Sequence, residues 1–125
     1  MRIEVKGRNL QVTDELRETV ARRFEKVGKQ VSELAQLDIE LYEERNPANP
    51  EQMVAEATLY LKGVTLRAKD ASSDIKHSIN LVADELARQV KRHRDKRRKR
   101  REQRAGAAQA ASPLSEAEDG AATAF

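Results

Sequence analysis

The chain contains no cysteine and no tryptophan, and only two histidines occur among its 125 residues. The absence of cysteine excludes a disulfide framework and a thiolate metal site. No apolar run approaches the roughly 20 residues that a membrane-spanning helix needs. Residues 1–7 alternate between polar and apolar and lack the apolar core of a secretory signal peptide. We therefore expect a cytoplasmic protein that has no membrane partner.

Catalytic chemistry finds equally little support in the sequence. No Gly-rich phosphate loop and no cluster of metal-ligand residues accompanies the two histidines. Acidic residues are frequent, but in the first predicted helix they alternate with cations, as Glu18 does with Arg22 and Glu25 with Lys29. Ion pairs at i,i+4 explain this spacing better than acid–base catalysis does. We expect a protein that is not an enzyme and that uses no cofactor, no metal and no small-molecule substrate.

Charge, in contrast, is abundant and unevenly placed. Residues 91–104 contain ten Lys or Arg against Asp95 and Glu102, a net charge of +8 in a chain whose total is +3. Residues 105–125 carry −3, and residues 1–90 therefore carry −2. So many cations within a few turns repel one another. A phosphate-rich partner would relieve that repulsion and release counterions, so the expected partner is a polyanion such as RNA.

The segment from Ser72 to Val90 has the spacing of an amphipathic helix that leads into this basic run. Its apolar residues recur at intervals of three and four and form one stripe: Ile75, Ile79, Val82, Leu86 and Val90. Ser72 or Ser73 is expected to cap the helix start, and Asp74 suits the positive end of the helix dipole. The sequence leaves three interpretations of the basic run open: a solvated helical extension, a tail that attracts any polyanion, and a positioned RNA-binding element.

The preceding part of the chain is predicted to form a small sheet. Period-two alternation predicts strands at residues 2–6, 37–42, 53–61 and 64–69, and an apolar stripe over residues 16–27 predicts a helix after the first strand. Each strand has one apolar and one polar face, so the sheet is expected to be covered on one side only. The order β-α-β-β-β-α predicts a two-layer α+β sandwich, a four-stranded sheet with two helices on one face. The last three strands should form an antiparallel meander, with the first strand added in parallel.

Three cations of the first helix, Arg22, Lys26 and Lys29, share one face. From the sequence, pairing with neighbouring acids and contact with RNA explain them equally well. If both helices pack on one face of the sheet, these three residues lie beside Arg88 and Lys91 and form one wide cationic surface.

The only two tyrosines, Tyr42 and Tyr60, fall on the polar face of the predicted sheet. Aromatic residues on a sheet can stack on nucleobases. Cross-strand packing is the interpretation that we prefer for both.

Several segments taken together resemble the ribosome hibernation promoting factor family, whose members are also called ribosome-associated translation inhibitors. The segments are 7–10 (GRNL), 12–18 (VTDELRE), 24–27 (FEKV), 55–59 (AEATL) and 88–96 (RQVKRHRDK). Their order and spacing follow the family over about residues 1–98. The resemblance implies a short-type factor or the N-terminal domain of a long-type one, with a fold like a double-stranded-RNA-binding domain.

The resemblance also implies a function. It implies binding to the small (30S) subunit of the 70S ribosome, in the 16S rRNA channel where mRNA and tRNA occupy the A and P sites. The protein would block translation and stabilise inactive ribosomes in stationary phase or stress. The family's cationic contacts carry over onto Arg88, Lys91, Arg92, Arg94 and Lys96, and also onto Arg22, Lys26 and Lys29. The alternative is a general RNA- or nucleoid-binding module that uses the same basic arm.

The chain departs from the family at two positions and has its own tail. The family often has a tyrosine where this chain has Lys76 and an acid where it has Asn80. We expect residues 1–98 to form the ribosome-binding domain and residues 99–125 to be a basic extension followed by a disordered Ala-rich tail. A segment so poor in large apolar residues cannot supply an interface between ribosomes, so we expect no ribosome pairing by this chain alone.

Overall fold

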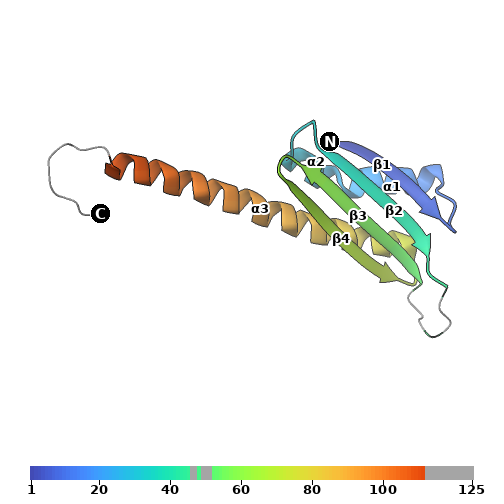
Figure 1. Cartoon of the computed structure of the whole chain (residues 1–125). Coiled ribbons are helices and arrows are strands. Elements are labelled where there is room, and N and C mark those ends of the chain that lie inside the picture. The colour runs from blue at the N-terminus through green and yellow to red at the C-terminus, as the bar shows by residue number, and fades with distance from the viewer. Residues whose placement is uncertain (46–47, 49–51, 112–125) are drawn as a thin grey trace. The chain divides into compact units, whose positions relative to one another are not determined.

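The computed structural model describes residues 1–45, 48 and 52–111, and its contacts divide the chain into two units, the first of which is Met1–Lys91. In this first unit, helices cover one face of a four-stranded sheet (Figure 1), which confirms the predicted two-layer α+β sandwich. The elements are β1 (Arg2–Arg8), α1 (Asp14–Arg23), α2 (Glu25–Gln30), β2 (Gln36–Glu43), β3 (Met53–Leu61), β4 (Val64–Ser72) and α3 (Ile75–Ala111).

The sheet has the strand order β1-β2-β3-β4. β1 pairs in parallel with β2, and β2, β3 and β4 form an antiparallel meander, as predicted. Lys62 and Gly63 make the tight turn after β3, and Gly63 has a φ of +81°, which residues with a side chain rarely adopt. β1 continues to Arg8, past its predicted end at Gly7. A Cβ at Gly7 would lie 2.3 Å from the carbonyl oxygen of Leu10, so this close approach requires glycine.

The predicted first helix is present, but it is divided at Phe24 into α1 and α2. Thr13 caps α1, because its Oγ1 accepts a hydrogen bond from the amide of Leu16 at 3.2 Å. Phe24 has a ψ of 6°, outside the helical range. Its amide nevertheless donates to the carbonyl of Val20, and its carbonyl accepts from the amide of Gly28, both at 3.0 Å. The apolar stripe passes through this break without interruption, so periodicity gave no sign of it.

The start of α3 differs from the prediction. β4 extends to Ser72, so the first of the two serines expected to cap the helix is the end of a strand. The cap is instead Asp74, whose Oδ1 accepts a hydrogen bond from the amide of Lys76 at 3.2 Å. The hydroxyl of Ser78, which is fully buried, donates to the carbonyl of Met53 at 2.7 Å. The bond from Ser78 attaches the beginning of α3 to the first residue of β3.

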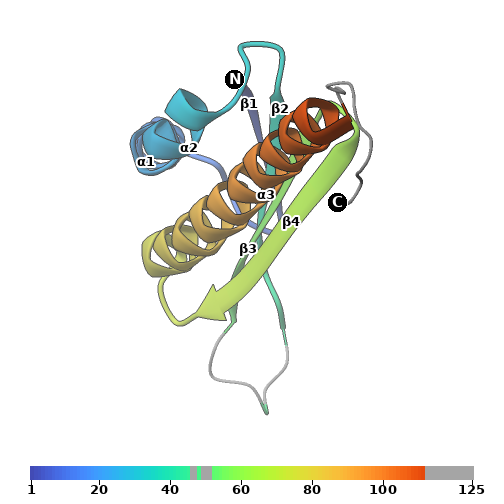
Figure 2. The same cartoon turned by 90° about the vertical axis from the view of Figure 1, so that its left-hand side faces the viewer.

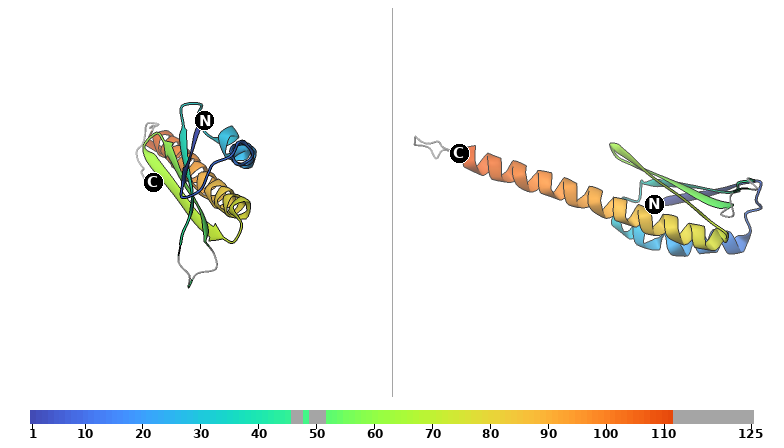
Figure 3. Two further views of the ribbon diagram at one scale, coloured as in Figure 1. Left: turned by 90° about the vertical axis from the view of Figure 1, so that its right-hand side faces the viewer. Right: turned by 90° about the horizontal axis from the view of Figure 1, so that it is seen from below.

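The core lies between the helices and the inner face of the sheet. α3 buries the predicted stripe, and side chains that are at most 2% exposed include Val20, Phe24, Val27, Leu37, Ile39, Leu41, Leu59, Ile79, Val82, Leu86 and Val90. Figures 2 and 3 show the helices of the first unit on the same face of the sheet. No described segment of that unit covers the opposite face, so the prediction of a sheet covered on one side is confirmed.

From Arg92 onward the chain forms the second unit, whose described part is helical through Ala111. Residues 105–111, predicted to belong to a disordered tail, are therefore helical. Five of the seven are alanine, and alanine is the strongest helix former. The rest of the predicted tail, residues 112–125, lies outside the described residues, and a domain boundary at residue 98 stays a prediction.

Candidate nucleic-acid interface

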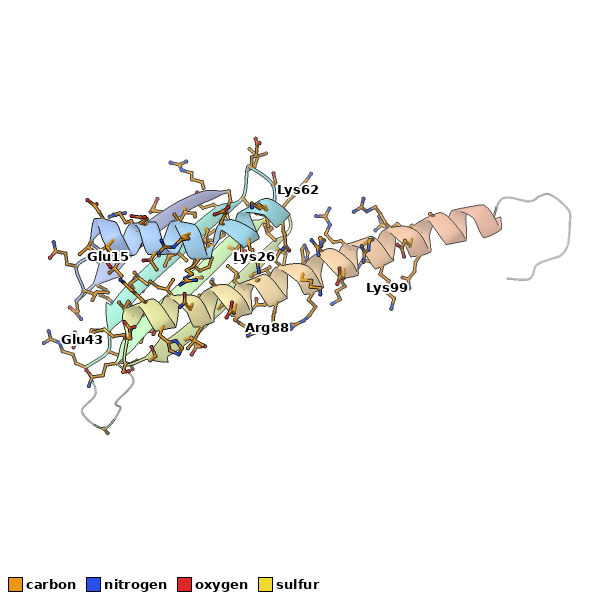
Figure 4. All side chains as sticks on the ribbon, turned by 180° about the vertical axis from the view of Figure 1, so that it is seen from behind. Glu15, Lys26, Glu43, Lys62, Arg88 and Lys99 are labelled. Atoms are coloured by element: carbon orange, nitrogen blue, oxygen red, sulfur yellow. The ribbon has the colours of Figure 1, made fainter. Side chains whose placement is uncertain are left out.

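A groove of about 540 Å³ lies between the α1–α2 segment and α3, within the first unit. It is lined by Arg22, Arg23, Glu25, Lys26, Lys29, Asn80, Ala83 and Asp84. Four of these residues carry a positive charge and two a negative one, so the groove is cationic. Figure 4 labels Lys26 on α2, the short helix that lies beside α3.

Core packing explains why these side chains line the groove. Val20 and Val27 direct the apolar side of α1 and α2 toward the sheet, which leaves Arg22 and Lys26 on the exposed side. On α3, Ala83 is buried and contributes only a methyl group, which leaves space between the helices. A larger residue at that position would fill the floor of the groove.

Of the two ion pairs predicted in the first helix, one is present and the other is not. Lys29 pairs with Glu25, its Nζ 3.2 Å from the carboxylate, as the sequence spacing suggested. The other predicted pair, Glu18 with Arg22, does not form: among the described residues, no ion pair of at most 4.0 Å joins these two side chains. Within the described parts of the chain, Arg22 and Lys26 have no acidic partner. These two exposed cations are therefore available to an external anion.

The side chain of Asn80 places in the groove a hydrogen-bond acceptor that has no donor among the described residues. Its Oδ1 is closed off from solvent and receives no hydrogen bond from any residue that the structure describes. Leaving a buried acceptor unpaired costs on the order of 1–3 kcal/mol. An amide is uncharged, so Asn80 leaves the positive charge of the groove undiminished.

The structure groups some of the predicted contact residues and leaves others apart. Arg22, Lys26 and Lys29 line one groove, but Arg88 and Lys91 do not belong to its lining. On α3 the groove is lined by Asn80, Ala83 and Asp84, and a single cationic surface that also includes Arg88 and Lys91 stays a prediction. Arg88 is exposed and pairs with Glu85 at 2.7 Å, while Lys91 is exposed at the end of the first unit.

The remaining predicted contacts belong to the second unit. Arg92, Arg94 and Lys96 are all exposed on α3 (Lys99, farther along the same helix, is labelled in Figure 4). Asp95 lies 4.0 Å from Arg94 and 3.6 Å from Arg98, so it neutralises little of the run's charge. At about 100° per residue, consecutive cations point to all sides of the helix. This part of α3 therefore offers positive charge in every direction.

Tyr42 is used within the sheet, as predicted. Its ring is covered by the guanidinium of Arg8, 4.2 Å from the ring centroid, and its hydroxyl donates to Glu56 at 2.9 Å. Burial, followed by the hydrogen bond to Glu56, raises the pKa of Tyr42. The hydrogen bond to Tyr42 is the main cause that raises the pKa of Lys69, whose ammonium lies 3.4 Å from Glu56. Tyr60, on the same face, is 44% exposed.

One contact that joins two distant segments could not be found from local spacing. Lys76, at the start of α3, forms an ion pair and hydrogen bond with Glu15 in the first turn of α1. The hydrogen bond to Lys76 and its charge lower the pKa of Glu15. Glu15 and Lys76 are 61 positions apart, so only the packed helices bring them together. The groove residues Arg23 and Asp84 were missed for the same reason.

The described residues contain no group of three or more His, Cys, Asp or Glu that could hold a metal ion. Among the helices that the structure describes, none combines the length and the apolar character needed to cross a bilayer.

A family model described as "Sigma 54 modulation protein / S30EA ribosomal protein" matches residues 3–98. The chain is 31% identical over 97 residues to a ribosome hibernation promotion factor from Picosynechococcus, with 77% of this chain and 50% of that protein covered. The chain thus spans only half the length of this relative. It is also 30% identical to a ribosome hibernation promoting factor from Salmonella typhimurium, with 77% of this chain and 96% of that protein covered.

Among solved structures, the chain is similar to the N-terminal domain of Protein Y from Thermus thermophilus. The TM-score is 0.65 at 26% sequence identity, and the match covers 74% of this chain and 99% of the other.

Proposed function

The chain belongs to the Sigma 54 modulation protein / S30EA ribosomal protein family, and we propose that it is a ribosome hibernation factor. It binds the small ribosomal subunit through rRNA, occupies the channel of mRNA and tRNA at the A and P sites, and holds the ribosome inactive in stationary phase or stress. The observation that carries this proposal is the family match over residues 3–98, which includes the sheet from Ile3 onward, the groove and the first cations of the basic run. The proposed role is non-enzymatic.

The charges of the first unit support binding to RNA. Arg22 and Lys26 are exposed beside a groove, and neither has an acidic partner within the described residues. Cations that have no ion pair within the protein contribute the most to the free energy of RNA binding. Their contact with phosphate releases the counterions condensed on the RNA. We expect these two residues to contribute more than Lys29, whose ammonium is already paired with Glu25.

The charges of the second unit support binding within a channel. Cations point to all sides of α3 from Arg92 to Arg104, so a helix placed against one flat surface would leave about half of them unused. A channel with rRNA phosphates on several sides would use them all. Arg92, Arg94 and Lys96 are the contacts that we propose here, together with Arg88 and Lys91 from the first unit.

The direct test is co-sedimentation of the protein with 30S, 50S and 70S particles on a sucrose gradient. We expect the protein in the 30S and 70S fractions and absent from the 50S fraction. Filling the channel beforehand with mRNA and tRNA should release the protein. Equal binding to 30S and 50S particles, unaffected by mRNA and tRNA, would contradict the proposed site.

That contrary result would favour a second candidate, a general RNA- or nucleoid-binding module. The observation in its favour is the basic run itself, whose ten cations in fourteen residues suit any polyanion. Such a module would bind total RNA as tightly as it binds empty 30S subunits.

A further inference from the structure

The two tyrosines on the uncovered face of the sheet have opposite surroundings. Arg8 covers the ring of Tyr42 and Glu56 accepts its hydroxyl hydrogen bond, and the side chain is 6% exposed. Tyr60 is 44% exposed and has no hydrogen bond or cation–π partner among the residues that the structure describes. The side chain of Tyr42 is therefore used in contacts within the sheet, whereas much of the side chain of Tyr60 is exposed to solvent.

The strand register defines the neighbours of Tyr60. It lies between Gln36 of β2 and Thr65 of β4, and Arg2 of β1 lies opposite Gln36. These four side chains form one row across the uncovered face. The flanking residues are small or polar, so Tyr60 is the only large apolar group in its row.

The cations around Tyr60 are unpaired, whereas those around Tyr42 are paired. Arg2, Lys62 and Arg67 are exposed and form no ion pair with any described residue (Lys62 is labelled at the β3–β4 turn in Figure 4). At the other end of the sheet, Arg8 lies 3.8 Å from Glu40, and Lys69 lies 3.4 Å from Glu56.

The row of side chains next to that of Tyr60 contains an acid that is hydrogen-bonded within the sheet. Asp38 lies in the next row of side chains, and its Oδ1 accepts a hydrogen bond from Gln36 at 2.8 Å. The end of the sheet that carries Tyr60 therefore combines an exposed aromatic side chain with three exposed cations that form no ion pair with any described residue.

From these observations we propose that Tyr60 is a stacking platform for one unpaired nucleobase of RNA, with the adjoining phosphates held by Arg2, Lys62 and Arg67. A base supplies the flat π-face that the open ring fits, and its phosphates supply the charge that the three cations lack. A protein partner would need a larger apolar area than a single tyrosine between Gln36 and Thr65 provides.

The inference rests on the proposed function and deepens it. The groove lies on the helical face of the sheet, whereas Tyr60 lies on the opposite face. A protein that binds RNA with both faces of its first unit is enclosed by RNA rather than attached to it by one side. The platform thus adds a contact that a purely electrostatic mode would not have.

The absence of tryptophan makes a direct test possible, because Tyr60→Trp places a single tryptophan in the full chain, whose fluorescence can be excited selectively. The probes are an unstructured adenosine-rich RNA 12-mer and inorganic polyphosphate, which has the charge but no bases. We expect the RNA to quench the tryptophan and polyphosphate to leave it nearly unchanged. Equal quenching by both, or quenching by neither when both bind, would overturn the proposal.

Affinity for 30S subunits gives the second readout. Stacking on one base contributes enough that Tyr60→Ala should weaken binding roughly 5- to 150-fold. Tyr60→Phe, which keeps the ring, should bind like the original chain. The slope of log K against log salt should stay the same in both variants, because no phosphate contact is lost.

Tyr42→Phe is the matched control, since it removes the hydroxyl of the covered tyrosine and should leave affinity unchanged. Tyr60→Ala binding as tightly as the original chain, with its thermal unfolding intact, would overturn the platform while leaving the proposed function in place. Failure of the original chain to bind 30S subunits would instead refute the proposed function, and the RNA 12-mer would still decide whether Tyr60 stacks on a base.

Discussion

Replacing Arg22 and Lys26 with alanine tests whether the groove binds phosphate. Both side chains are exposed on the helical face and have no ion pair within the described residues, so their removal breaks no internal contact of that kind. Alanine is also a better helix former than either residue. The double variant should therefore unfold at nearly the same temperature as the original chain.

The expected loss of affinity follows from counterion release. Each phosphate contact changes the slope of log K against log salt by roughly 0.7 to 0.9. At about 0.1 M salt this amounts to roughly 5- to 8-fold in affinity per contact. Losing both contacts should weaken 30S binding roughly 25- to 60-fold and reduce the slope by about 1.4 to 1.8.

The assay is equilibrium binding to 30S particles over a salt series, with Lys6→Ala/Lys69→Ala as the matched control. The control removes the same charge from the sheet, but its two lysines are already paired with Glu4 at 3.5 Å and with Glu56 at 3.4 Å. The control slope should change by less than that of the groove variant. Equal slopes for the two double variants would show that total charge, and not the groove, determines binding.

Three further predictions concern stability, pH and ribosome pairing. Leu86→Ala should lower the free energy of unfolding by roughly 2–5 kcal/mol in a urea titration because the side chain is fully buried; if exposed Lys91→Ala costs as much, the core boundary is misplaced. The pKa of Glu15 is lowered below 4.5 in the folded chain, so its pair with Lys76 stabilises the fold above that pH and is lost as pH falls through the lowered value. Thermal unfolding of Lys76→Met should thus fall below that of the original chain near neutral pH and converge with it in acid; a constant difference at all pH values would exclude the ion pair as the cause. Adding the chain alone to 70S particles should give no 100S peak on a gradient, since residues 105–125 contain few large apolar groups; a stable 100S peak would reveal a pairing surface.

The sheet could be predicted almost completely from the sequence. Period-two alternation located the four strands, and the buried residues Leu37, Ile39 and Leu59 confirm which face of β2 and β3 is apolar. The strand ends were less accurate, because hydrogen bonding continues past the last alternating residue. β4, for example, runs to Ser72 through pairing with β3 rather than through any apolar pattern.

The helical layer was predicted in its apolar stripes but not in its details. The stripe of α3 from Ile79 to Val90 is buried as expected, because a period of three and four is a local property of the sequence. The break at Phe24 was not predicted, since both sides of it bury the same stripe. The sequence analysis expected Ser72 or Ser73 to cap α3, but the cap is Asp74. The residue that caps the helix depends on where β4 ends, which the sequence did not show.

The sequence by itself determined the class of fold, the positions of the apolar stripes and the concentration of positive charge after Val90, since each depends on residues close together in the chain. Only the tertiary structure decided which charges remain unpaired and which side chains meet. It placed Arg22 and Lys26 opposite Asn80, joined Glu15 to Lys76, and covered Tyr42 while leaving Tyr60 open. These outcomes depend on the packing of helices and the register of strands. Both bring together residues that are far apart in the sequence, so the periodicity of the sequence does not reveal these contacts.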